Sequence, residues 1–309
     1  MNPHLILGSR GSDLALAQVQ LVRDALLRAH PALSIDVKII TTSGDRRQEL
    51  KAGEGSNAGL KGLFTKEIQD ALLAGSIDAA IHSLKDLPGI TPAGLEVTAV
   101  LERADPSDIL LSRDSPGLAS LRPGARVGTG SVRRGRQLKW LRPDLEILDL
   151  RGNVPTRLEK LAAQPLDAIV LARAGLERLG HTISAGILSG PHHFHAMALD
   201  ILPAIGQGAI GIEIHAGNTN ARALFAPIDH EITHNCIRVE RALLRLLDGD
   251  CRLPVAARVT QSGSLLHAQA LVFPDDETLP PAQARSTGPA SAPESLAQTL
   301  FLQISQPRP

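Results

Sequence analysis

The feature that most constrains the fold of this chain is a cation placed directly after a short apolar run. Residues 127–134, Val-Gly-Thr-Gly-Ser-Val-Arg-Arg, pass from an apolar run through small turn residues to two arginines that open an amphipathic helix pattern. Other apolar runs also end in a cation, at Arg10, Lys85 and Arg151. Ligands of open α/β sheets bind where strands end, and helix N-termini and guanidinium groups attract anions. The pattern therefore predicts an α/β protein with an anion site.

The composition narrows the kind of anion. Lysine and arginine together number 32, as do aspartate and glutamate, so the formal net charge is zero and the cations form a local pocket. Nucleic-acid-binding proteins carry broad basic surfaces and often use aromatic side chains for stacking, whereas aromatic residues make up only 2% of this chain. We therefore expect a small anionic ligand and no nucleic-acid partner.

Localisation is predicted from the start of the chain and from its apolar stretches. Residues 1–11 contain a three-residue apolar run and no basic segment, and no stretch approaches the roughly 20 apolar residues of a membrane span. We expect a cytoplasmic protein with no membrane partner. Two cysteines cannot form a disulfide framework. Cys236 lies in an amphipathic pattern and is expected to pack, whereas Cys251, in a glycine-containing loop, is a candidate nucleophile.

Alternating strand and helix patterns predict two α/β lobes followed by a smaller C-terminal region. Strands are expected at 5–8, 35–40, 77–82 and 95–101 in the first lobe, and at 125–129, 145–150 and 167–172 in the second. Helices are expected at 12–29 with Ser12 as N-cap, 65–74, 131–141 and 155–163. The polar residues 41–62 predict a functional loop or lid.

The C-terminal third has weaker patterns. Residues 201–214 alternate like a strand, and residues 231–247 predict a helix. Residues 274–293 are rich in Pro, Ala, Ser and Gly and predict turns and linker, followed by a closing helix at 295–304.

Two short motifs have a local explanation. Residues 206–211 satisfy the dinucleotide-binding glycine pattern, but strand-like alternation follows where that motif requires a helix. His230 and His234 satisfy the zinc-peptidase pattern without its extended form, and we interpret them as histidines at a helix start. Residues 192–195 are interpreted as a loop with histidines. We expect no metal, and a zinc peptidase built on His230 and His234 stays as an alternative.

A carboxylate accompanies the cations. Asp86 directly follows Lys85, and in a cationic pocket it is expected to stay ionised and to steady a positive charge or relay a proton. A larger basic set comes from several segments and suits one ligand with several carboxylates: Arg10, Arg133, Arg134, Arg151 and Arg157, with Lys61 from the long loop. The alternative is that these side chains are solvated and that Lys85 and Asp86 occupy a surface turn.

Over nearly its whole length the chain resembles the porphobilinogen deaminase family, also called the hydroxymethylbilane synthases. The motifs occur in the family's order: Ser-Arg-Gly-Ser at 9–12, Lys-Gly-Leu-Phe at 61–64, His-Ser-Leu-Lys-Asp at 82–86, Val-Gly-Thr at 127–129, Arg-Arg at 133–134, Leu-Arg-Gly-Asn at 150–153, Thr-Arg-Leu at 156–158 and residues 202–213. The resemblance implies an α/β fold of two periplasmic-binding-protein-like lobes with a hinge, plus a smaller C-terminal α+β domain. The implied domains are residues 1–102 plus 201–221, residues 103–200 and residues 222–309.

The resemblance also implies the chemistry. Cys251 would carry, through a thioether, a dipyrromethane cofactor that serves as a primer. Four porphobilinogen molecules would each lose ammonia and join head to tail, and hydrolysis would release hydroxymethylbilane for tetrapyrrole biosynthesis. Asp86 would stabilise the cation formed from porphobilinogen and handle pyrrole N–H protons. The enzyme is expected to work as a monomer.

Further roles follow from the same resemblance. Besides Cys251 and Asp86, the cofactor would be held by Ser83, Lys85, Thr129, Ser131, Arg133, Arg134 and Arg157. The substrate would be bound by Arg10, Ser12, Gln18, Lys61, Phe64, Arg151 and Arg178.

Three positions depart from the family pattern. Gly130 replaces a usual serine, Asn57 falls where a lysine is common, and Asp250 replaces a glycine beside Cys251. A neighbouring carboxylate disfavours the thiolate, so cofactor attachment is expected to be slower. The alternative from another class is a non-catalytic carboxylate-binding module, which would need the arginines but neither Asp86 nor Cys251.

Overall fold

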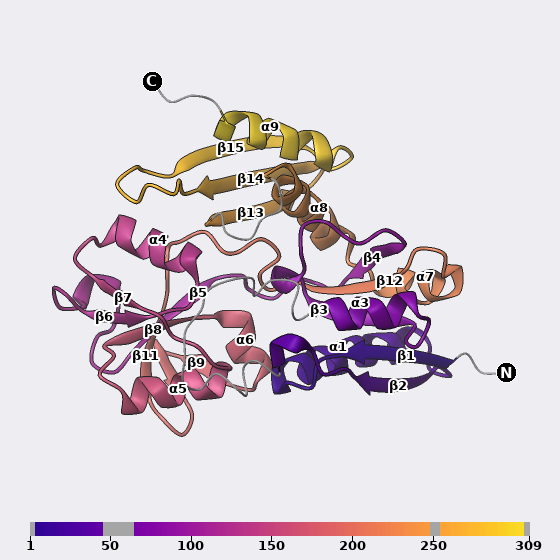
Figure 1. Ribbon diagram of the computed structural model, residues 1–309, viewed down its shortest axis with the longest axis horizontal. Helices are drawn as coiled ribbons and strands as arrows, with labels where there is room; N and C mark the ends of the chain where they lie inside the picture. The colour runs from indigo at the N-terminus through magenta and orange to yellow at the C-terminus, as the bar shows by residue number, and fades with distance from the viewer. Residues whose placement is uncertain (1–3, 46–64, 248–253, 306–309) are drawn as a thin grey trace.

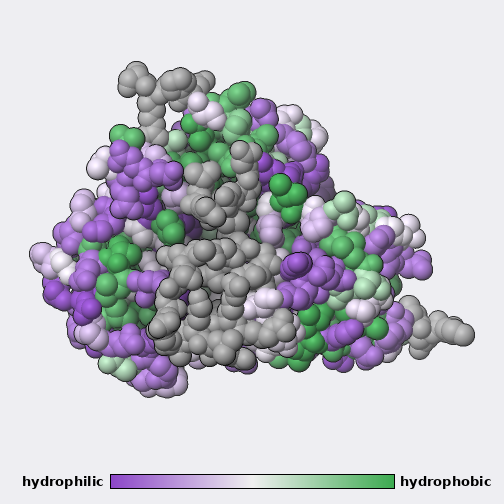
Figure 2. Space-filling view, in the orientation of Figure 1, coloured by the Kyte–Doolittle hydropathy of each residue, from purple (hydrophilic) through white to green (hydrophobic). Residues whose placement is uncertain are grey.

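The structure, a computed structural model, describes residues 4–45, 65–247 and 254–305 in three sheet-containing parts (Figure 1). The first two are mixed α/β lobes, and the third is a smaller sheet covered by helices. This is the α/β class that the sequence predicts. Figure 2 shows hydrophilic side chains over both lobes, interspersed with smaller hydrophobic patches.

The first lobe is built on a five-stranded sheet of order β2-β1-β3-β12-β4. Its strands are β1 (His4–Ser9), β2 (Ser34–Ile39), β3 (Ala79–Ser83), β4 (Leu95–Val100) and β12 (Ile210–His215). Its helices are α1 (Asp13–Ala29), α3 (Lys66–Leu73) and α7 (Thr219–Phe225), with 3-10 turns η1 (Leu84–Asp86) and η3 (Ala226–Ile228). Strand β1 runs parallel to β2 and β3, whereas β12 returns late in the sequence, antiparallel to β3 and β4.

Helix α1 shows how local sequence specifies this lobe. The Ser12 hydroxyl accepts a hydrogen bond from the backbone N–H of Ala15, as an N-cap does. Val19, Val22 and Leu26 recur at helical spacing and are buried against the sheet. Phe225 of α7 is fully buried in the same core, so the first core extends beyond residue 221.

The second lobe contains a seven-stranded sheet of order β7-β6-β8-β5-β11-β10-β9. Its strands are β5 (Asp108–Ser112), β6 (Arg126–Gly128), β7 (Glu146–Leu148), β8 (Ala168–Ala172), β9 (Thr182–Ser184), β10 (Ile187–Ser189) and β11 (Phe194–Ala198). Its helices are η2 (Leu118–Ser120), α4 (Val132–Leu141), α5 (Val154–Ala163) and α6 (Arg173–Arg178). Strand β6 is parallel to β7 and β8, and α4 and α6 follow directly after β6 and β8.

The C-terminal part is a three-stranded antiparallel sheet with two helices. The strands are β13 (Val255–Ser262), β14 (Leu265–Val272) and β15 (Ala282–Pro289), and the helices are α8 (Glu231–Leu246) and α9 (Pro293–Ser305). From Ala257 onward strand β13 alternates between buried and exposed residues, so one face of the sheet packs on α8 and α9, and the other is open at Arg258 and Thr260 but covered at Ala256. Cys236 is buried in this core, as expected.

Two predictions about the chain path were wrong. The strand expected over 201–214 begins only at Ile210, because Gly206 and Gly208 adopt positive φ and turn the chain before it. The linker expected over 274–293 contains β15, whose alanine, threonine and serine residues pair with β14 despite low hydrophobicity. Strands β5, β9, β10, β11, β13 and β14 were not predicted.

Part of the predicted lid, residues 46–62, lies outside the described residues. No helix in the described ranges is long and apolar enough to cross a membrane.

Candidate functional site

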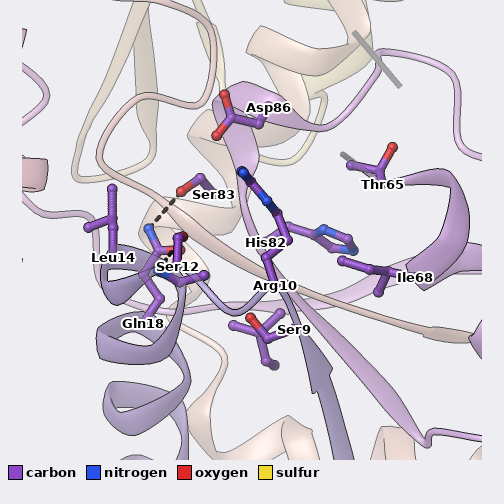
Figure 3. A pocket seen from close by; sticks show the side chains of 12 residues that line it. Ser9, Arg10, Ser12, Leu14, Gln18, Thr65, Ile68, His82, Ser83 and Asp86 are labelled. Atoms are coloured by element: carbon purple, nitrogen blue, oxygen red, sulfur yellow. Dashed lines mark hydrogen bonds between the residues drawn. The ribbon is translucent and has the colours of Figure 1, made fainter. Parts of the chain in front are cut away.

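A pocket of about 60 Å³ lies where β1 and β3 end (Figure 3). Ser9, Arg10 and Ser12 reach it from the turn between β1 and α1, and Ser83 and Asp86 reach it from the end of β3. The two parallel strands bring these segments together although they are more than 70 positions apart in sequence.

Gln18 and Arg10 fix the polar side of this pocket. The buried Gln18 amide donates to the Ser83 hydroxyl at 2.6 Å. Arg10 donates through Nε to Asp45 Oδ1 at 3.1 Å. Burial by itself raises the pKa of Asp45, but hydrogen bonds from Arg10 and Thr42 outweigh it and lower that pKa. Arg10 is therefore held in place by a carboxylate of its own lobe.

A smaller pocket next to the first is lined by residues of both lobes. Gln18, Ser83 and Lys85 line it from the first lobe, and Arg178 lines it from α6 of the second. Arg178 donates to the backbone oxygen of Gly208 at 2.6 Å, and burial lowers its pKa to about 10.

Lys85 is the least compensated cation of the site. Its ammonium makes no hydrogen bond or ion pair with any residue that the structure describes. Burial is the main cause that lowers its pKa to about 8; the charges of Arg134 and Arg133 act in the same direction, and those of Asp86 and Asp108 oppose it. The site has more positive charge here than its described carboxylates balance.

Arg133 and Arg134 are buried, and both pair with Asp108 at the start of β5. Arg133 Nη2 lies 2.7 Å from Asp108 Oδ2, and Arg134 donates from Nε and Nη2 to Oδ1 at 3.0 and 2.7 Å. The Gln207 amide adds a fourth donor at 2.8 Å. Arg133 Nε is buried with no hydrogen-bond partner among the described residues. Most donors of both arginines are therefore already used within the protein.

The second lobe contributes the other predicted residues. Ser131 is the N-cap of α4, and Thr129 accepts a hydrogen bond from the Ser131 N–H. Arg157 Nε donates to the Gly152 oxygen at 2.7 Å, and exposed Arg151 pairs with Asp149 at 2.8 Å.

The Arg157 guanidinium also interacts electrostatically with charged residues of both lobes. Burial lowers its pKa to about 10, with Arg134 and Arg151 acting in the same direction and Asp149 and Asp86 opposing. Because Asp86 belongs to the first lobe, Arg157 and Asp86 interact electrostatically across the boundary between the lobes.

Three predicted site residues belong to the segments outside the described ranges. Lys61, Phe64 and Cys251 lie outside the described residues, as do Asn57 and Asp250. The thioether attachment to Cys251 stays a prediction.

Some residues of the site were missed by sequence reasoning. Asp108 starts an apolar strand, and an acid before such a run gives no signal that two arginines from another segment will meet it. Beneath the pocket, buried Glu213 of β12 lies 3.0 Å from His82 Nε2 and accepts from the Gln69 amide at 3.0 Å. The alternating strand pattern of β12 makes Glu213 predictable as an inward-facing acid, but not its partners.

The two motifs given a local explanation take structural roles. The His230 side chain caps α8 by accepting from the Thr233 N–H, and His234 Nδ1 lies 2.9 Å from Asp229 Oδ1. Within the described ranges, no group of three His, Cys, Asp or Glu residues is arranged to hold a metal ion. Gly206 and Gly208 lie against the backbone of Leu84 and Ala104, where a Cβ would clash.

The fold and site define a two-lobed α/β protein with a cationic crevice suited to a ligand that carries several carboxylates. A family model described as porphobilinogen deaminase, dipyromethane cofactor binding domain, matches residues 5–223. The chain belongs to the porphobilinogen deaminase family.

Relatives agree over nearly the whole chain. The porphobilinogen deaminase of Moorella thermoacetica is 46% identical over 95% of this chain and 92% of its own length. That of Syntrophobacter fumaroxidans is 42% identical over 91% of each chain.

Solved structures give a weaker likeness. The periplasmic VFT2 domain of BvgS from Bordetella pertussis has a TM-score of 0.43 at 15% identity, covering 74% of this chain and 87% of that one. The L-cystine solute receptor of Neisseria gonorrhoeae has a TM-score of 0.41 at 12% identity, covering 78% and 91%. The fold assignment rests on the sheets described above.

The residues present fit the cofactor that the family model names. A dipyrromethane with acetate and propionate arms needs cations that are not already neutralised. Lys85 has no partner in the described chain, and the buried Arg133 Nε lacks one as well. Both groups suit carboxylate oxygens.

Proposed function

We propose that this chain is a hydroxymethylbilane synthase, a transferase that joins four porphobilinogen molecules head to tail with release of ammonia. One observation carries the proposal: Lys85, beside Asp86, is a partly buried cation without a described partner, facing a crevice lined from both lobes. An unmatched buried cation costs free energy unless an anion binds. The porphobilinogen acetate and propionate groups supply such anions.

We propose that the site residues divide into two sets, one for the cofactor and one for the substrate, as the family resemblance implies. Lys85, with Ser83, sits at the lobe junction and holds carboxylates of the dipyrromethane together with Arg157, Thr129, Ser131, Arg133 and Arg134. The incoming substrate is held by Arg10, Ser12, Gln18, Arg151 and Arg178, with Lys61 and Phe64 from the long loop. When attached through Cys251, the cofactor supplies the pyrrole carbon from which the product chain grows.

Asp86 does the chemistry in this proposal. Its carboxylate is exposed at the end of η1 and lines the pocket at the strand ends. Porphobilinogen loses its amino group as ammonia, and the positive charge left on the pyrrole lies against this carboxylate. Asp86 then accepts the proton that the newly bonded pyrrole carbon must release. A charge placed in advance where positive charge develops lowers the barrier to both steps.

The test is turnover of porphobilinogen by Asp86→Asn, followed as ammonia release. We expect a loss of about 10²–10⁴-fold with substrate binding largely kept, because asparagine preserves shape but not charge. Asp70→Asn on α3, an exposed carboxylate away from the crevice, is the matched control and should keep full activity. Full activity in Asp86→Asn would refute the role, and an inactive wild type would favour a carboxylate-binding module without catalysis.

The proposal extends to organisation and setting. We propose three domains, residues 1–102 plus 201–228, 103–200 and 229–309; the first extends past the expected residue 221 because Phe225 of α7 packs in its core. We further propose a monomer that works in the cytoplasm on a small-molecule substrate, without nucleic-acid or membrane partners. Support comes from the zero net charge and from a pocket that residues of both lobes of one chain line.

A further inference from the structure

A larger cavity lies away from the crevice. It opens between the open face of the β13-β14-β15 sheet, helix α4 and residues 199–203 of the second lobe, and its volume is about 600 Å³. Figure 1 shows α4 below this sheet. Ligand sites of proteins commonly measure about 300–1,000 Å³, so the cavity has the size of a binding groove.

The floor of the groove carries two arginines in one row. Strand pairing sets Arg258 of β13 opposite Gln269 of β14, and Gln269 opposite Arg285 of β15. All three side chains are exposed on the open face and line the groove. Neighbouring strands lie about 4.8 Å apart, so the backbones at the two arginines are separated by about 10 Å.

These arginines have no direct ionic partner in the described chain, although the Asp105 carboxylate interacts electrostatically with Arg258. Neither Arg258 nor Arg285 makes a hydrogen bond or an ion pair with a described residue, whereas other exposed arginines do, such as Arg122 with Asp167. Asp200 is the acidic side chain among the described residues that line the groove. The floor therefore favours an anion with acid groups spaced across two strands.

The opposite wall is aromatic and apolar. Trp140 and Leu141 of α4 are 45% and 46% exposed, although both are large hydrophobic residues. The Trp140 ring packs edge-on against the Phe273 ring, with 6.2 Å between the ring centroids, and the Arg136 guanidinium lies over the Phe273 ring. A wall of this kind suits the flat body of a ligand whose acid groups reach the arginines.

We propose that this groove is a second ligand site, which binds an aromatic or pyrrolic polycarboxylate outside the reaction crevice. Two acid groups of the ligand pair with Arg258 and Arg285, and its ring packs on Trp140. The distance between the arginines and the volume of the groove favour a pyrrole oligomer over a single pyrrole. The claim that the ligand is a pyrrole oligomer rests on the proposed function. The claim that the groove binds an aromatic polycarboxylate does not depend on the proposed function.

The chain offers a direct readout. Trp140 is its only tryptophan and it has no tyrosine, so intrinsic fluorescence reports on the wall of this groove. The probe is trimesate, an aromatic tricarboxylate, titrated against purified protein, with the aliphatic tricarballylate for comparison. We expect saturable change of Trp140 emission with trimesate and weaker binding of tricarballylate. Uroporphyrin I, a stable tetrapyrrole with eight carboxylates, should displace trimesate.

Matched variants localise the response. Arg258→Gln and Arg285→Gln should each weaken trimesate binding about tenfold, the value of one charge-assisted hydrogen-bond pair. Arg23→Gln on α1, an exposed arginine without a described ion pair, should leave it unchanged. Turnover of porphobilinogen should be the same in all three variants, because none touches the crevice.

The outcomes separate this proposal from the proposed function. Absence of a saturable Trp140 response, or equal affinity in Arg258→Gln and wild type, would overturn the groove as a site. Equal binding of tricarballylate would overturn the aromatic contact. If trimesate binds but the wild type does not turn over porphobilinogen, the groove stands and the proposed function falls. If turnover is normal and uroporphyrin I does not displace trimesate, the pyrrole identity of the ligand is refuted.

Discussion

Replacing the buried Asp108 with asparagine should lower the free energy of unfolding more than the same replacement at an exposed aspartate. The Asp108 carboxylate is fully buried and accepts from Arg133, Arg134 and Gln207. Asparagine keeps the shape but turns an NH₂ group toward one of the arginines and leaves two guanidinium groups without a counter-charge. Breaking a buried ion pair by removing one partner costs about 3–5 kcal/mol, and we expect a loss of that size in the free energy of unfolding.

The pH dependence of this loss follows from the pKa of Asp108. Burial by itself raises that pKa, but the charges of Arg134 and Arg133 outweigh it and hold the pKa well below its usual range. The carboxyl titrates near pH 3.9 when unfolded. Its contribution is therefore complete above about pH 4 and is lost as the pH falls toward the folded pKa. The difference between wild type and Asp108→Asn should be full at pH 7 and shrink below about pH 4.

The assay is urea unfolding followed by circular dichroism at several pH values. Asp144→Asn is the matched control, because Asp144 also pairs with an arginine, Arg142, but on the surface, and its loss should not change stability measurably. A loss below about 1 kcal/mol in Asp108→Asn, or a loss independent of pH, would refute the reasoning.

Three further predictions concern the crevice and the close contact between Gly208 and the Ala104 backbone. Because burial lowers the pKa of Lys85 to about 8, kcat/KM should fall as the pH rises through that value, and Lys85→Arg should move the fall to higher pH; an unshifted profile would contradict the assignment. In Gly130→Ser, the new Cβ would lie 2.9 Å from a backbone oxygen, so we expect about 1–3 kcal/mol lower stability and a higher KM, measured by unfolding and kinetics. Gly208→Ala places a Cβ 2.4 Å from the Ala104 oxygen and should cost more than about 3 kcal/mol, against about 1–2 kcal/mol for Gly263→Ala, which has positive φ but open space; equal costs would show that crowding is not the cause.

The fold was predictable where apolar periodicity is strong. Helix α1 lies within one residue of the predicted 12–29 range and has the predicted Ser12 cap, because cap and buried stripe both come from local sequence. Strand β15 was not predictable in the same way. Its residues are small and polar, and its pairing with β14 is a long-range property that composition does not reveal.

The candidate site was also predictable only in part. The sequence predicts that Arg10, Lys85 and Asp86 follow strand ends, and the structure places Arg10 and Asp86 in one pocket and Lys85 in its neighbour. It does not predict that Asp108 already binds Arg133 and Arg134, since this depends on the way β5 enters the second sheet beside β8. Whether those arginines also bind the cofactor stays a prediction.

The central claim is that a cofactor is tethered at Cys251 and held by the cationic crevice. Intact mass spectrometry of the purified wild type and of Cys251→Ser tests it most directly. We expect an added mass equal to dipyrromethane on the wild type and none on the variant, which should also lose turnover. An unmodified wild type that still converts porphobilinogen would contradict the account.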